Sequence, residues 1–176
     1  RIPAVELATG VLFALVWTRY GFSYEGVAMM GYAGYFLVVL AIDLGKQIIP
    51  NVLVITSFAA SMVVASFWPD LGPAGAAAGA GVGFGLLLAL YLFPGAATGE
   101  EDVKLAAVVG AATGYPLVAV GLAVAVLSGG ITAVTLLATG RRSRKDRMPF
   151  GPFLAVGALV ALAWGDTILD WYTDHF

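Results

Sequence analysis

Apolar segments of roughly membrane-spanning length follow one another along almost the whole chain, and they constrain its fold more than any other feature. A helix needs about 20 apolar residues to cross the hydrocarbon of a bilayer. Seven such segments can be drawn, of which the fifth is much shorter than the others: residues 3–18, 24–44, 51–67, 73–93, 102–113, 116–139 and 149–171. We therefore expect an all-α, polytopic transmembrane helix bundle with six full spans and one short or broken helical segment.

The composition agrees with this class. Of the 176 residues, 60% are hydrophobic and 11% are charged, whereas soluble domains are about half apolar and about a quarter charged. The lipid bilayer is therefore the expected surrounding of a single membrane-embedded domain over residues 1–176. The chain has no cysteine, which excludes a disulfide framework, a thiolate metal site and a cysteine nucleophile.

The short segment, residues 102–113, has three readings. At about 1.5 Å per residue it is too short to cross a bilayer alone. It is tilted, it is completed by the Tyr115-Pro116 corner, or it is a broken helix. Non-helical backbone at membrane depth is tolerated only inside protein or beside water, and the sequence leaves the three readings open.

Basic residues predict the orientation. Five of the nine Lys and Arg residues fall in residues 141–147, and cytoplasmic loops carry such an excess. The run could also be a patch for anionic lipid or nucleic acid; we expect an orientation signal in contact with lipid, and no nucleic-acid partner. If residues 102–113 cross the membrane, residues 45–50 and 95–101 are cytoplasmic too, the N-terminus is inside and the C-terminus is outside.

Glycines recur at four-residue spacing in the fourth segment, at Gly75, Gly79 and Gly83. Small residues at this spacing allow two helices to approach closely. The pattern predicts close helix packing, with a ligand site as the minor alternative.

Two aspartates are candidates for function, because ionisable residues are costly to keep in a membrane. Asp43 ends the apolar run of residues 37–42, and Asp102 opens the short segment. The topology count places both on the cytoplasmic side. Asp102 could instead be an ordinary helix-capping acid. We expect four other acids at the outer membrane surface: Glu25, Asp70, Asp166 and Asp170. Glu6 is expected either at the headgroups or hydrogen-bonded inside the bundle.

A pair of aspartates has a defined chemistry. Two carboxyl groups at close range cannot both ionise, so they share one proton. The ionised group can activate a water for attack on an amide carbonyl, and the protonated group can donate to the oxygen and then to the leaving amine. This chemistry needs no metal and no cofactor, and we predict none. The only histidine, His175, lies at the outer terminus, and the chain has no HExxH motif.

Three motifs resemble a known family. Residues 41–51 (AIDLGKQIIPN) are similar to its Asp-containing segment that ends in Ile-Pro-Asn or Leu-Pro-Asp. Residues 99–107 (GEEDVKLAA) are similar to its GxGDxKL motif, and residues 149–155 (PFGPFLA) to its PFGPFLA segment. The opening residues 3–10 also resemble its helix start. In this order the motifs resemble the peptidase domain of the type IV prepilin peptidases, membrane aspartic proteases of the GxGD type.

The resemblance implies a catalytic pair, Asp43 and Asp102, with Gly99, Glu101 and Lys104 as supporting motif residues. It implies prepilin or pseudopilin substrates of type IV pili and type II secretion. They would be cut after a short basic leader at the cytoplasmic face of the bacterial inner membrane. Lys104 either holds a carboxylate ionised or extends to anionic headgroups.

The chain departs from the family pattern at Glu101, where the second glycine of GxGD is expected. Glycine would allow close backbone approach or a positive φ. Glutamate instead adds a third acid beside the pair. It could change the protonation of Asp102, alter substrate preference, or point to solvent.

Bacterial members of the family often carry an N-terminal region with CxxC motifs that is linked to methylation by S-adenosylmethionine. Without cysteine, this chain is either a peptidase-only member or the C-terminal piece of a bifunctional one, and we expect no methyltransferase activity from it alone. A rival function is a small ion-coupled transporter, because a broken helix with carboxylates at its end is also a transporter feature. A structural membrane subunit is a third reading.

Overall fold

The computed structural model describes residues 2–46, 48–68, 70–93, 98–140 and 149–175. Within these ranges the chain is all-helical, and the seven expected helices form in the expected order. Each begins and ends within a few residues of its predicted bounds, and the last continues to His175. They are α1 (Ile2–Tyr20), α2 (Tyr24–Lys46), α3 (Asn51–Phe67), α4 (Gly72–Tyr91), α5 (Glu100–Thr113), α6 (Leu117–Ala138) and α7 (Gly151–His175).

Among the described residues, four helices are long and apolar enough to cross a membrane: α2, α4, α6 and α7. α3 is apolar but shorter, with 17 residues, and α1 is outside this group. The chain is therefore a multi-pass membrane protein, while the count of six full spans stays a prediction. The basic residues 141–147, which carried the predicted orientation, lie outside the described residues.

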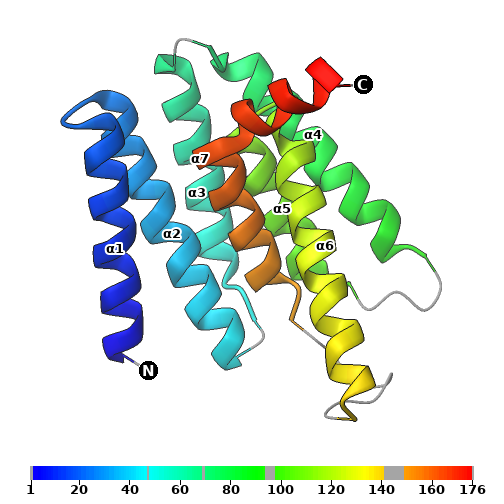
Figure 1. Ribbon diagram of the computed structural model, residues 1–176. Helices are drawn as coiled ribbons and strands as arrows, with labels where there is room; N and C mark the ends of the chain where they lie inside the picture. The colour runs from blue at the N-terminus through cyan, green and yellow to red at the C-terminus, as the bar shows by residue number, and fades with distance from the viewer. Residues whose placement is uncertain (1, 47, 69, 94–97, 141–148, 176) are drawn as a thin grey trace.

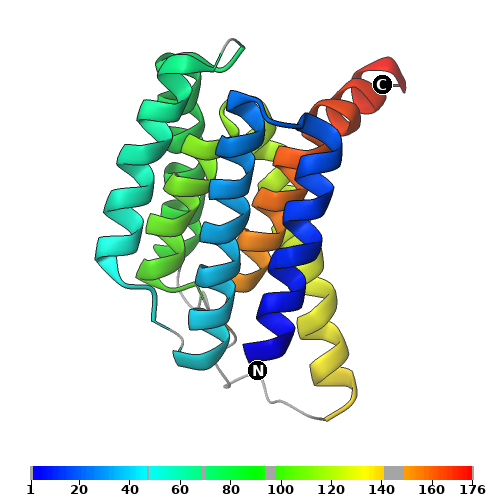
Figure 2. The same cartoon turned by 90° about the vertical axis from the view of Figure 1, so that its left-hand side faces the viewer.

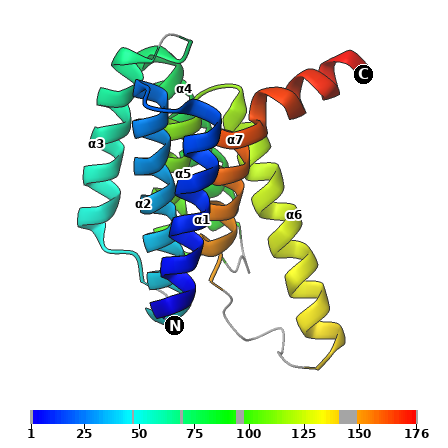
Figure 3. The same cartoon turned by 60° about the vertical axis from the view of Figure 1, so that its left-hand side comes forward.

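Consecutive helices run in opposite directions, so their ends collect on two sides of the bundle. α2, α4 and α6 end on the side of the bundle on which α3, α5 and α7 begin, and α6 extends furthest on that side (Figures 1 and 2). The turns after α1, α3 and α5 lie on the opposite side. α1 stands at the edge of the bundle against α2 (Figure 3).

The short helix α5 is the centre of the bundle. It packs against α3, α4, α6 and α7, and most of its 14 residues are buried. It is a continuous helix rather than a broken one. It ends at Gly114, whose φ of 71° favours glycine, and the chain then turns at Tyr115 and Pro116 into α6.

The glycine pattern does pack helices, as predicted. A Cβ atom on Gly79 would overlap the carbonyl oxygen of Gly110, and one on Gly83 would overlap that of Ala106. The backbones of α4 and α5 are therefore in direct contact, as small residues permit. Gly81 and Gly85 face open space instead.

Candidate active site

Asp43 lies in the last turn of α2, on the face that packs into the bundle. Phe36 and Val39, seven and four residues earlier, are fully buried, and this spacing puts all three side chains on one side of the helix. Asp43 is 5% exposed. The apolar run that buries α2 thus carries the carboxylate into the interior at its end.

Asp102 is the third residue of α5 and is 8% exposed. Its Oδ2 accepts a hydrogen bond of 2.9 Å from the backbone N–H of Gly99, the N-cap residue. This is one half of a capping box; Gly99 has no side chain to make the other half. The capping interpretation of Asp102 is therefore correct for one oxygen, and it coexists with burial of the carboxylate inside the bundle.

The structure brings Asp43 and Asp102 to the same end of the bundle. Their charges interact, and the backbone of Gly151, the first residue of α7, lies close to both carboxylates. The site is thus built where α2 ends and where α5 and α7 begin (Figure 1).

Asp43 Oδ2 is buried and makes no hydrogen bond of standard geometry with the described residues. A buried oxygen without a partner is rare in native proteins and calls for an explanation. A proton shared with the second carboxyl group, or a water held between the two, would satisfy it.

Apolar residues close to the site residues in the sequence are buried. Ile49, in the connection from α2 to α3, is 2% exposed, and Leu105 and Leu154 are fully buried. All three belong to one core cluster. Exclusion of water strengthens the interaction between charges, so this setting favours a pair that shares one proton over two separate carboxylates.

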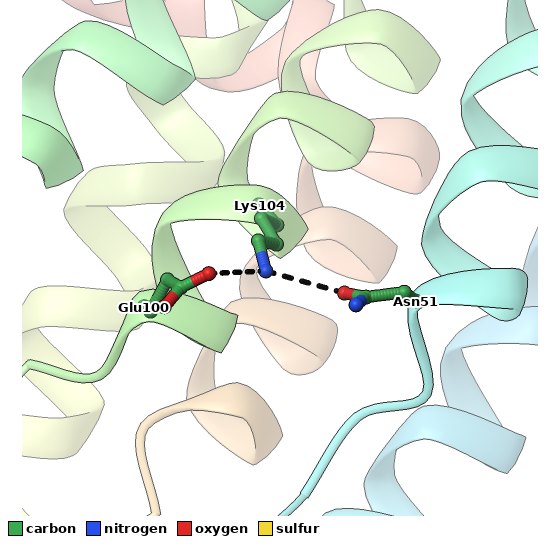
Figure 4. A network of polar contacts seen from close by, with 3 residues as sticks. All are labelled: Asn51, Glu100 and Lys104. Carbon is green, nitrogen blue, oxygen red and sulfur yellow. Dashed lines mark hydrogen bonds and ion pairs between the residues drawn. The ribbon is translucent and has the colours of Figure 1, made fainter.

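Lys104 does not pair with either aspartate. Its Nζ lies 2.5 Å from Glu100 Oε1 and donates a hydrogen bond of 3.2 Å to Asn51 Oδ1 (Figure 4). The hydrogen bond and the charge of Lys104 lower the pKa of the exposed Glu100 carboxyl. The side chain thus ties the start of α5 to the start of α3 beside the site.

Glu101 is half-buried, and its Oε2 is buried without a hydrogen-bond partner among the described residues. This oxygen does not face solvent, contrary to one of the three readings of Glu101. Its charge acts on Asp43, on Asp102 and on Lys104. Glu101 is therefore a third acid of the same site.

The other acids lie elsewhere. Glu6, Asp70, Asp166 and Asp170 are exposed, and Glu25 is half-buried. In the described part of the chain, no group of three or more His, Asp and Glu side chains has an arrangement that could hold a metal ion. Sequence reasoning gave no role to two residues of the site, Asn51 and Gly151, although both belong to the quoted motifs.

Comparison with known proteins identifies the family. The pattern of the type IV leader peptidase family matches residues 30–134, a range that holds Asp43, Asp102 and Lys104 but not the PFGPFLA motif. The chain therefore belongs to this family, which confirms the resemblance drawn from the motifs and the predicted enzyme class, a peptidase. No solved structure matches the chain.

Curated relatives align with almost all of the chain. It is 31% identical to the prepilin leader peptidase/N-methyltransferase of Bacillus subtilis, over 97% of this chain and 68% of the relative. It is 32% identical to the protein of the same name from Stutzerimonas stutzeri, over 98% of this chain and 61% of the relative. The Pseudomonas aeruginosa relative is 31% identical over the same shares, 98% and 61%. The chain thus spans roughly three fifths to two thirds of these relatives' lengths.

Proposed function

We propose that this chain is a membrane aspartic endopeptidase that removes the short basic leader of type IV prepilins or pilin-like proteins. The observation that carries the proposal is the pair of buried aspartates, Asp43 and Asp102, at one end of an apolar helix bundle. The names of the curated relatives support the substrate class.

In the proposed reaction the two aspartates share one proton. The ionised carboxylate takes a proton from a water, and the resulting hydroxide adds to the carbonyl carbon of the scissile amide. The protonated carboxyl donates to the carbonyl oxygen, and the amine then leaves with a proton from the site. One water is consumed, and the products are a carboxylic acid and an amine. As the C–N bond breaks, the amine takes the proton that came from the water, and a hydroxyl of the tetrahedral intermediate returns its proton to the other carboxylate, which restores the starting state.

The proposed topology puts this reaction at the cytoplasmic face of the bacterial inner membrane. Five of the nine basic residues fall in the sequence between α6 and α7, and α6 ends and α7 begins on the same side of the bundle (Figure 1). The positive-inside rule makes that side cytoplasmic. A substrate would then keep its apolar helix in the membrane and present its basic leader to the site.

A cleavage assay with a pilin-like substrate in vesicles tests the function. Asp43→Asn and Asp102→Asn should each abolish the product while the protein remains folded. Asp166→Asn, an exposed acid of α7, is the control and should cleave as the unmodified chain does. Cleavage retained in either dyad variant would exclude the proposed pair.

Methylation is a separate activity of the named relatives, and we propose that this chain alone does not perform it. The rival function, an ion-coupled transporter, gains no support from the family or from the fold. A single peptidase domain over residues 1–176 stays a prediction.

A further inference from the structure

The PFGPFLA motif has no part in the reaction as written above, yet it touches the proposed site. Gly151 is the first residue of α7 and is buried. A Cβ atom on Gly151 would overlap Oδ2 of Asp43 and would lie 3.1 Å from its Cγ and 3.3 Å from Ile49 Cδ1. Only a residue without a side chain leaves room for the Asp43 carboxylate in its observed place.

This contact differs from those of the packing glycines. At Gly79, Gly83 and Gly157 the atom that a Cβ would overlap is a backbone carbonyl oxygen of the neighbouring helix. At Gly99 the nearest atom is Asp102 Oδ2, at an ordinary contact distance of 3.4 Å. Among the described glycines, only Gly151 is placed so that an added Cβ would overlap an atom of a charged side chain.

The local sequence also leaves Gly151 with a free donor. The N–H groups of Phe153 and Leu154 both bond to the carbonyl oxygen of Phe150, and Pro152 has no N–H. The Gly151 N–H is therefore the donor of this first turn that the helix itself does not use. It lies close to both carboxylates, short of full hydrogen-bond geometry to Asp43 Oδ2.

We propose that Gly151 is a positioning residue for the aspartate pair. Its missing side chain admits the carboxylate of Asp43, and its backbone N–H holds that carboxylate within reach of Asp102. The role rests on the proposed peptidase function and goes beyond it, because it assigns a task to the third motif. The unpartnered Oδ2 of Asp43, on a side chain that is 5% exposed, is the atom on which Gly151 acts.

The test compares Gly151→Ala with Gly165→Ala, the same substitution in the same helix. A Cβ on Gly165 would meet Leu117 Cδ2 at 3.2 Å, the end of a flexible side chain far from the site. For Gly151→Ala we expect kcat to fall by about 10²-fold, the cost of a misplacement of about 1 Å at the chemistry. KM should stay within about twofold, and the pH profile of kcat should move, since the two carboxylates no longer share a proton in the same geometry. Gly165→Ala should keep both kinetic constants and the pH profile.

A second measurement needs no activity. The chain has no cysteine, so the double variant Asp43→Cys/Gly151→Cys should form an intramolecular disulfide on mild oxidation. Asp43→Cys paired with Gly165→Cys should not. Absence of the first cross-link would overturn the geometry on which the proposal stands.

The outcomes separate this proposal from the proposed function. If the unmodified chain cleaves a prepilin and Gly151→Ala cleaves it equally well, the positioning role is wrong and the peptidase stands. If Gly151→Ala fails to fold, or loses thermal stability together with kcat and KM, the glycine serves packing and the proposal is overturned. If the unmodified chain cleaves no prepilin, the proposed function falls first, and the positioning role falls with it.

Discussion

The two aspartates are held in place in opposite ways. Asp102 is fixed by its own turn of helix, through the hydrogen bond from Gly99 N–H to its Oδ2. The carboxylate of Asp43 lies against Gly151, a residue remote in the sequence, and its Oδ2 has no hydrogen bond of standard geometry. One carboxylate is anchored locally, and the other depends on how α2 and α7 pack.

This difference suits the two halves of a shared-proton pair. A carboxylate that accepts a backbone N–H bond is stabilised in its charged form. A buried oxygen without such a bond is better satisfied as a protonated group or by a water. Both carboxylates lie close to the Gly151 backbone, so the comparison assigns the shared proton to neither of them. It separates Asp102, which its own turn of helix positions, from Asp43, which helix packing positions, and the predictions below test this asymmetry.

The largest expected effect is on catalysis, and here the two aspartates should not differ. General acid–base catalysis by a positioned group contributes about 10²–10⁴-fold, and each member serves both directions of proton transfer. Asp43→Asn and Asp102→Asn should each lower kcat by at least that range, and the double variant should be no worse than either single one. Additive losses, measured in one cleavage assay, would show that the two residues act independently.

The same asymmetry explains how much of this arrangement can be predicted from the sequence. The helices and the position of Asp102 depend on apolar run lengths and on a local capping pattern, which one segment of chain reveals by itself. The place of Gly151 against Asp43 depends on the packing of α7 on α2, across more than a hundred residues, and no local pattern encodes it. The motif PFGPFLA signalled that these residues matter without saying what they touch. The partner of Lys104 was missed for the same reason, because Asn51 belongs to another helix.

The next largest effect concerns the close contact between the backbones of α4 and α5. Gly83→Ala would push a methyl group into the carbonyl oxygen of Ala106, one turn from Asp102 on the same face. Overpacking of this kind costs about 1–3 kcal/mol. We expect a lower Tm in detergent and a fall in cleavage, because Asp102 moves with its helix while Asp43 does not.

Gly85→Ala is the matched control in the same helix, since a Cβ there meets nothing within 4 Å. Alanine is the better helix former by roughly 0.5–1 kcal/mol, so this variant should be as stable as the unmodified chain or slightly more. Equal losses in Gly83→Ala and Gly85→Ala would mean that the α4–α5 contact does not hold the site.

A smaller effect is expected on stability, where substitutions of the two aspartates should differ. Asp102→Ala leaves the Gly99 N–H without its acceptor, and loss of a capping interaction costs about 0.5–2 kcal/mol. Asp43→Asn removes a buried charge whose Oδ2 has no partner, so stability should stay level or rise. Thermal unfolding of both variants measures the contrast. A larger destabilisation by Asp43→Asn than by Asp102→Ala would reverse the asymmetry.

The smallest effect is expected at Lys104, which stands beside the pair without touching it. Lys104→Met removes both its contact with Glu100 and its hydrogen bond to Asn51. Exposed ion pairs contribute little to stability and are screened by salt, so Tm should barely change and should respond less to added salt than before. Cleavage should fall by much less than the about 10²-fold that a misplacement of about 1 Å costs at the chemistry. Asn51→Ala, which removes only the link to α3, should reproduce most of that fall. If Lys104→Met were instead as inactive as Asp102→Asn, Lys104 would have to hold the aspartate ionised, and the local anchoring of Asp102 by Gly99 would not be sufficient.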